Sequence, residues 1–516
     1  MKKNHIIVSL FLTSVLLWGS GCQKDFLSSL ANNPNTPSTA TPQLLLTGAL
    51  TTTASIVNGG TFQLEAMWMG YWNYSGNYGV KAPDKSYRMT TGSPQIWDTY
   101  YPNLTNYDYM EKLAAGTPHY QDFVAIAKIM KAFDFQYLVD EYNDVAYSKA
   151  FKGSADFFPT YDKGQAVYTN LVNQLDTAMT LIATNDPQAV NPQGSDVMFG
   201  GDMSMWAKFA NTLKLRILLR MSQVSSESSF IASEIGKTSS VGYLGLGEDA
   251  LVNPGYNNSQ TSNQNPMWRT YGLNPGGGLY SDAYNFVRAG AYAMNFYKAN
   301  NDPRLGYFYY TAGDDPTDPN FLKTVQTDTS KFQADYFGTT NPTPNSGTSG
   351  MGPGVLKGPD APAVIMTASE SLFLQAEAAY RGWISGDPGT LYDQAITASF
   401  EYLYNGISSQ SQADQDAQAY YSQAKNDVNY AASSNKLEAI LTQKWAALNG
   451  ISNIECYDDW RRTGFPAVML TEEPTNTNTH LPYRFYYPQS EYNKNADAVK
   501  AEGTIDPFTN KPFWMP

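Results

Sequence analysis

Apolar residues recur along most of this chain at the three- and four-residue spacing that places them on one face of an α-helix. The clearest case lies between 123 and 137, where the apolar face consists of Phe123, Ile126, Ala127, Met130, Phe133 and Tyr137. The same spacing predicts further helices over 97–104, 168–181, 206–217, 366–383, 392–400 and 436–449. We therefore expect a mainly α-helical protein.

Two of these predicted helices form a candidate pair. The first, at 366–383, carries the small residues Ala376 and Ala379, and a Gly- and Pro-containing turn follows it at 385–389. The second, at 392–400, carries small and aromatic residues on one face. Small residues on one helix facing such a stripe on the next are typical of tetratricopeptide-like pairs. The sequence thus favours packed helical pairs as the building unit.

Three long segments show no regular spacing and are rich in Gly, Asn, Pro and aromatic residues. They span 57–92, 253–285 and 312–362. Long irregular segments inside a compact body usually serve a function or move. We therefore look for a binding site in these segments first.

Aromatic side chains on such segments are candidates for ligand contacts, because no helical face accounts for them. A sugar ring has an apolar face that stacks on Trp or Tyr, while its hydroxyl groups need polar partners. The predicted ligand-binding residues are Trp68, Tyr71, Trp72, Tyr74 and Tyr78 in the first segment and Trp268, Arg269, Tyr271 and Tyr280 in the second. Packing in the core is the alternative role for each of them.

The N-terminus has the pattern of an export signal. Lys2 and Lys3 precede an apolar stretch at 6–18 that is too short to span a membrane, and small residues then lead to Cys22. We expect acyl chains on Cys22 to anchor the mature protein to a membrane; ordinary cleavage with an incidental Cys22 is the alternative. The expected division is a signal peptide at 1–21, a lipid-anchored tether at 22–40 and a body at 41–516.

The overall charge narrows the possible partners. The formal net charge is −13, and no basic cluster stands out along the sequence. An acidic chain without such a cluster argues against nucleic acid and anionic lipid surfaces as partners. Only Cys456 remains after Cys22, so the mature chain has no intramolecular disulfide available.

Residues typical of catalytic or metal sites do not occur in the required patterns. The three histidines are isolated from one another, and the glycine-rich run 347–354 matches neither phosphate-binding motif. The acidic residues at 314–318 lack the spacing of a calcium loop. We expect no metal, no cofactor and no enzymatic activity. Glu370 and Glu377 are interpreted as hydrogen-bonded packing residues, and Cys456 as a buried inert thiol.

Several runs along the chain resemble, in order, the SusD/RagB family of nutrient-binding lipoproteins. They are the start from Cys22 to Pro37 and the runs 137–147, 206–216, 370–382, 443–445, 459–464 and 482–488. The run 137–147 departs from the family pattern in having Asn143 in place of glycine and Ala146 in place of proline.

The resemblance implies a single large body of four tetratricopeptide-like helical pairs with long loops and minor β elements. It also implies a place in the outer membrane, lipid-anchored and facing the cell exterior. The implied partner is a SusC-type TonB-dependent transporter, over which the protein forms a lid. The family's ligand contacts lie in variable loops, so the resemblance assigns no binding residue.

The leading functional hypothesis is therefore a non-catalytic surface lipoprotein that captures an oligosaccharide and delivers it to the transporter. The same transport role with peptide ligands, as in the RagB branch, is the first alternative. A glycoside hydrolase is the second, because two carboxylates facing each other across a cleft would suffice for that chemistry.

Overall fold

The computed structural model describes residues 40–93, 96–184, 186–237, 241–279, 282–313 and 324–516. Cys22, the predicted signal peptide, nearly all of the predicted tether and Tyr280 lie outside these residues. The acidic residues at 314–318 also lie outside them.

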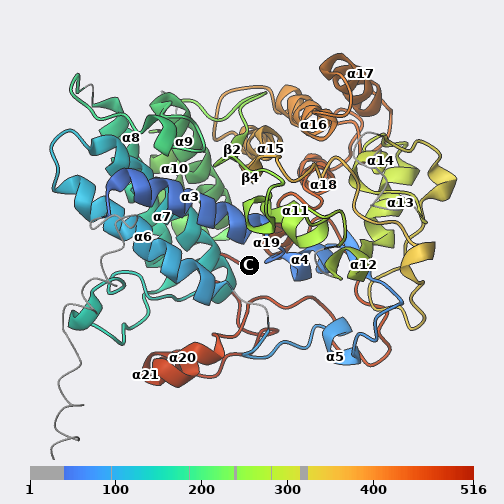
Figure 1. The fold of residues 1–516 in the computed structure, drawn as a ribbon, viewed down its shortest axis with the longest axis horizontal. Helices are drawn as coiled ribbons and strands as arrows, with labels where there is room; N and C mark the ends of the chain where they lie inside the picture. Colours follow the sequence, from blue (N-terminus) through green and yellow to red (C-terminus); the bar gives the residue numbers. More distant parts are fainter. Residues whose placement is uncertain (1–39, 94–95, 185, 238–240, 280–281, 314–323) are drawn as a thin grey trace, which may run out of the picture.

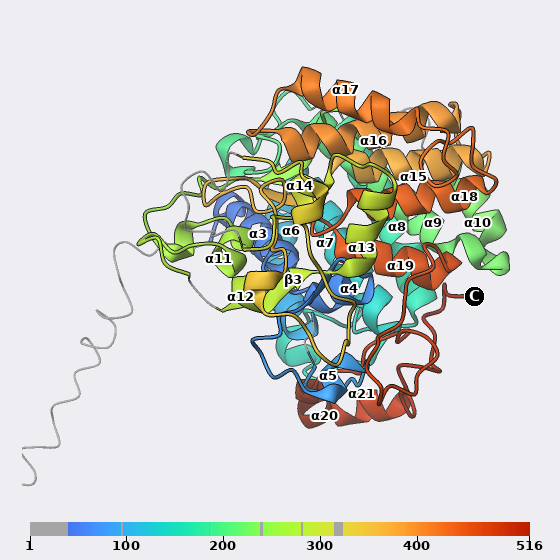
Figure 2. The same ribbon diagram turned by 90° about the vertical axis from the view of Figure 1, so that its right-hand side faces the viewer.

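Eight helices make up the repeating part of the fold (Figures 1 and 2). They are α6 (Trp97–Ala115), α7 (Gln121–Tyr142), α8 (Gly164–Ala183), α9 (Met203–Arg220), α15 (Ala368–Tyr380), α16 (Pro388–Tyr404), α17 (Gln410–Tyr421) and α18 (Lys436–Ala447). Each helix from α6 to α9 packs on the next, α9 packs on α15, and α15 packs on α16 and α18, with α17 against α16. The prediction of a mainly α-helical body built of packed pairs is confirmed.

Sequence signals at the helix starts explain where several helices begin. Helix α3 (Pro42–Asn58) has Thr41 as its N-cap, whose hydroxyl oxygen accepts a hydrogen bond from the Leu44 amide at 3.3 Å. Asp387 caps α16 in the same way through the Thr390 amide at 2.7 Å. In both helices proline occupies a first-turn position, where its missing N–H costs nothing.

The remaining helices are shorter and lie mostly beside the pairs. They are α4 (Gln63–Trp68), α5 (Ala82–Lys85), α10 (Ser228–Ile235), α11 (Pro266–Tyr271), α12 (Ala283–Phe286), α13 (Ala291–Ala299), α14 (Leu305–Phe308), α19 (Asn453–Thr463), α20 (Gln489–Lys494) and α21 (Ala496–Ala501). Helix α3 packs on α6, and α19 packs on α4. No helix in the described part of the chain is long and apolar enough to cross a membrane.

Two small antiparallel sheets join segments that are far apart in the sequence. Strand β1 (Trp72–Tyr74) pairs with β3 (Val287–Ala289), and β2 (Ala250–Val252) pairs with β4 (Ala363–Met366). Segment 57–92, expected to be irregular, therefore contains α4, β1 and α5. These elements have three to six residues, too few to show a helical or strand period in the sequence.

Buried ion pairs join helices that are distant in the sequence. Arg462 of α19 donates from both terminal nitrogens to Glu377 of α15, at 2.5 and 2.7 Å. Arg216 of α9 reaches Glu370 of α15 at 3.1 Å. Buried charges are tolerated only when paired in this way. The interpretation of Glu370 and Glu377 as hydrogen-bonded packing residues is thus confirmed.

Candidate functional site

Most of the predicted ligand-binding side chains lie inside the protein. The buried ones are Trp68, Tyr71, Trp72, Tyr74, Trp268 and Tyr271, with exposed fractions between 0 and 7%. Tyr78 and Arg269 are half-buried. The ring of Tyr71 stacks on Trp445 with centroids 5.2 Å apart, and its hydroxyl donates to the Trp445 carbonyl at 2.7 Å. Such contacts are core packing.

The fold brings the two predicted aromatic segments together at one point. Trp72 from β1 meets Tyr271 from α11 edge to face, with centroids 5.6 Å apart. The Tyr271 hydroxyl donates to Gln63 at 2.9 Å, while Arg269 donates to Ser55 at 2.8 Å. This junction holds the short elements in place. The assignment of all nine residues to ligand binding stays a prediction.

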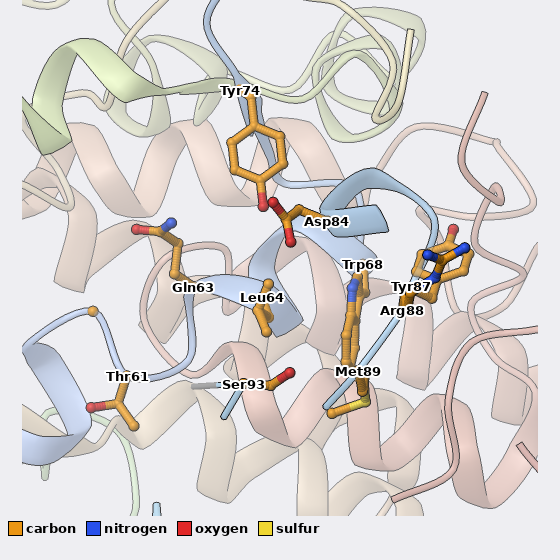
Figure 3. A pocket seen from close by; sticks show the side chains of 11 residues that line it. Thr61, Gln63, Leu64, Trp68, Tyr74, Asp84, Tyr87, Arg88, Met89 and Ser93 are labelled. Atoms are coloured by element: carbon orange, nitrogen blue, oxygen red, sulfur yellow. The ribbon is translucent and has the colours of Figure 1, made fainter. Parts of the chain in front are cut away.

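A cavity of about 260 Å³ opens where α4, β1, α5 and the following loop converge (Figure 3). We call it the α4–α5 pocket. Its lining consists of Gly60, Thr61, Gln63, Leu64, Trp68, Tyr74, Asp84, Tyr87, Arg88, Met89 and Ser93. Trp68 and Tyr74 are the two predicted binding residues that reach it. The volume lies just below the roughly 300 Å³ at which typical ligand pockets begin.

Aromatic rings form one wall of the α4–α5 pocket. Trp68 meets Tyr87 edge to face, with centroids 6.2 Å apart. Tyr87 has φ of 61°, a left-handed conformation that non-glycine residues rarely adopt. Its hydroxyl accepts a hydrogen bond from the Thr471 amide at 2.6 Å, which anchors the ring. A residue held in this strained conformation beside a cavity points to a functional constraint.

Polar side chains border the same pocket. Asp84 and Arg88 are exposed, and among the described residues neither side chain makes an ion pair or a hydrogen bond. The Asp84 carboxylate faces the Tyr74 hydroxyl (Figure 3), and burial, then this carboxylate, raise the pKa of Tyr74 above its usual range. Tyr74 therefore stays protonated and can act as a hydrogen-bond donor.

A second polar hollow of about 250 Å³ shares Arg88 and Met89 with the pocket. The rest of its lining consists of Ser86, the segment 475–478, Tyr486, Pro507 and Phe508. Sequence reasoning missed Asp84, Arg88 and this segment, since isolated polar residues on loops carry no motif. The alternation of Thr and Asn over 475–478 was the one available signal.

The arrangement is suited to binding an amphipathic ligand. Ring edges and polar groups that can both donate and accept hydrogen bonds surround a small cavity, which matches an amphipathic ligand. The described residues contain no group of three or more His, Cys, Asp or Glu side chains placed to hold a metal ion. Cys456 is buried, and burial raises the pKa of its thiol, so it is an unreactive side chain.

Solved structures share this fold. A SusD/RagB family protein from Bacteroides thetaiotaomicron superimposes with a TM-score of 0.73 at 20% identity, covering 92% of this chain and 99% of its own. A SusD homologue from Bacteroides fragilis gives 0.72 at 22%, covering 92% and 99%. A chitin-binding SusD homologue from Flavobacterium johnsoniae gives 0.69 at 22%, covering 91% and 98%.

The sequence itself matches a family model over residues 34–488, nearly the whole described chain. That SusD-like family is described as starch-binding and associating with the outer membrane. No curated protein matches the sequence. The match confirms the resemblance seen in the ordered runs of the sequence: this chain belongs to the SusD-like family.

Proposed function

We propose that this protein captures an oligosaccharide in the α4–α5 pocket and delivers it, chemically unchanged, to a SusC-type TonB-dependent transporter. The observation that carries the proposal is that Asp84 and Arg88, whose side chains are exposed and make no ion pair or hydrogen bond with another described residue, line the same pocket as Trp68 and Tyr87. Sugar hydroxyls need charged or amide partners, and sugar C–H faces need rings. The family description as starch-binding and one chitin-binding relative support this ligand class.

Calorimetry on the chain from residue 23 tests the ligand class. The probes are six-unit oligosaccharides of the starch and chitin types. We expect Asp84→Asn and Arg88→Ala to weaken binding about tenfold each, because each removes a charged hydrogen-bond partner. Lys331→Ala is the matched control, because Lys331 is an exposed cation that does not line the α4–α5 pocket. Wild-type affinity in both pocket variants, or no binding of any probe, would refute the proposal.

The delivery step needs the membrane-attached protein. We propose that Cys22 carries the lipid and that the body faces the cell exterior, where it forms a lid on the transporter. Mass spectrometry of the mature N-terminus checks the acyl chains, and a tagged chain purified from native membranes should bring the transporter with it. A co-purifying pool of peptides would favour the RagB-like alternative, and release of reducing ends by the pure protein would establish a hydrolase.

A further inference from the structure

A second, larger hollow is lined by a different set of residues. It has a volume of about 880 Å³ and lies between one face of α6, the loop 146–159 that follows α7, and α20. Figure 1 places these elements at the lower left of the molecule. We call it the α6–α20 groove. Its volume falls within the roughly 300–1,000 Å³ typical of ligand sites.

Exposed aromatic rings gather at this groove. Tyr109 of α6 is 47% exposed and Phe157 of the loop is 71% exposed, and both line it. Phe158, the next residue along the loop, is 67% exposed but does not line the groove. Large rings left in water forgo the free energy of burial, about 25 cal/mol per Å². Rings that remain exposed around one hollow mark a binding surface.

Polar groups alternate with these rings. Asp98 accepts hydrogen bonds from Ser490 at 2.8 and 2.9 Å but remains exposed, so its carboxylate keeps free acceptor capacity. Lys494 is exposed and, within the described chain, makes no ion pair or side-chain hydrogen bond. Thr105 is also exposed on the groove face of α6. Donors and acceptors thus lie within the same hollow as the two rings.

This composition favours a glycan over a protein partner. The buried centre of a protein interface is depleted in charged residues. The groove contains five of them, namely Asp98, Asp108, Lys112, Glu491 and Lys494. A sugar chain, whose units present C–H faces and hydroxyl edges together, uses rings and charged groups side by side.

We propose that the α6–α20 groove is a second oligosaccharide-binding site, in which sugar rings stack on Tyr109 and Phe157 while hydroxyls contact Asp98 and Lys494. The proposal rests on the proposed glycan-binding function.

The test is calorimetry with the same starch-type and chitin-type hexasaccharides on the chain from residue 23. Wild type should bind two ligands per chain, and the double variant Tyr109→Ala/Phe157→Ala should bind one. Each single variant should weaken the groove affinity about threefold to tenfold, the worth of one aromatic contact. Both rings are exposed, so the fold should tolerate these changes. Phe158→Ala is the matched control and should behave as wild type.

The outcomes separate the two sites. Wild-type stoichiometry and affinity in the double variant, with binding weakened about tenfold by Arg88→Ala, would overturn the groove proposal and support the α4–α5 pocket. Binding removed only by the double variant would support the groove and overturn the assignment of the α4–α5 pocket. No binding of any probe would overturn both. Loss of transporter co-purification in the double variant, with glycan binding unchanged, would overturn the glycan assignment in favour of a protein contact.

Discussion

Glu65 gives the stability of this protein a distinctive pH dependence. The side chain lies on α4 beside the pocket residue Leu64, is 3% exposed, and has one carboxylate oxygen without a hydrogen-bond partner. Burial raises its pKa from 4.5 to about 8; hydrogen bonding to the backbone and the charge of Arg461 lower it, and Asp458 adds to the rise. The folded protein therefore holds a proton on Glu65 that the unfolded chain releases at much lower pH.

The raised pKa of Glu65 makes the folded protein less stable as the pH rises. Between pH 4.5 and about 8 the folded state binds more protons at Glu65 than the unfolded state, so the free energy of unfolding falls as the pH rises. The stabilisation is complete below pH 4.5 and lost above about pH 8. At about 1.4 kcal/mol per pH unit, the full span amounts to roughly 5 kcal/mol as an upper bound. Glu65→Gln keeps the shape of the protonated carboxyl and removes the titration.

Urea unfolding followed by tryptophan fluorescence checks this expectation. The variant and the wild type should have similar midpoints near pH 5, and the variant should be more stable by several kcal/mol near pH 9. Asp393→Asn is the control. Burial raises the pKa of Asp393 only to about 6, so the stability difference between this variant and the wild type should change below about pH 6 and stay constant from there to pH 9. A Glu65→Gln difference that is equal at both pH values would refute the reasoning.

Two further substitutions test the packing. Arg462→Ala removes two hydrogen bonds from the buried carboxylate of Glu377 and leaves it Arg381 as its ion-pair partner, so the cost should lie at the lower end of about 3–5 kcal/mol. Replacing both Arg462 and Glu377 by Met should cost less, and thermal unfolding of the three chains distinguishes them. Gly76→Ala would place a Cβ atom 1.9 Å from the Pro342 carbonyl oxygen and should lower the free energy of unfolding by about 1–3 kcal/mol, while Gly79→Ala, with open space around it, should be near neutral in the same urea titration.

The sequence predicted the helical pairs because each long helix buries a face against its neighbours. A period of 3.6 residues becomes visible only when it repeats several times, as in α7 with 22 residues. The short elements α4 and β1 were not predicted for the opposite reason. Their conformations depend on distant partners, such as the pairing of Trp72 with Ala289 across the small sheet.

The residues of the proposed sites were harder to predict from the sequence than the fold. An aromatic residue on an irregular segment looks the same in the sequence whether it packs or binds, and Tyr71 and Tyr271 pack. The proposed groove contains a ring in polar sequence surroundings, Phe157, which follows Ser154-Ala155-Asp156. No sequence pattern marked Arg88 as a candidate binding residue. Its proposed role depends on its exposed position in the folded pocket, which the sequence does not show.

Several buried tyrosines satisfy backbone carbonyls that helix ends and loops leave without a partner. Buried backbone carbonyls must be hydrogen-bonded, and loops and helix ends leave many without a partner. Buried tyrosines supply those donors: Tyr71 and Tyr297 bond the carbonyls of Trp445 and Ala446 at the end of α18, at 2.7 and 2.9 Å. Tyr392 does the same for the Val428 carbonyl at 2.7 Å.

A ring with a hydroxyl therefore serves packing and backbone pairing at once, and this double role accounts for aromatic residues that no helical face explains. It also indicates which rings are available to a ligand. Phenylalanine cannot hydrogen-bond a carbonyl, so a phenylalanine on a loop either packs or remains in water. Phe157 remains in water beside the α6–α20 groove, together with Tyr109. Because the fold buries most of its rings, the exposure of these two rings beside one hollow supports the proposed glycan site at the groove.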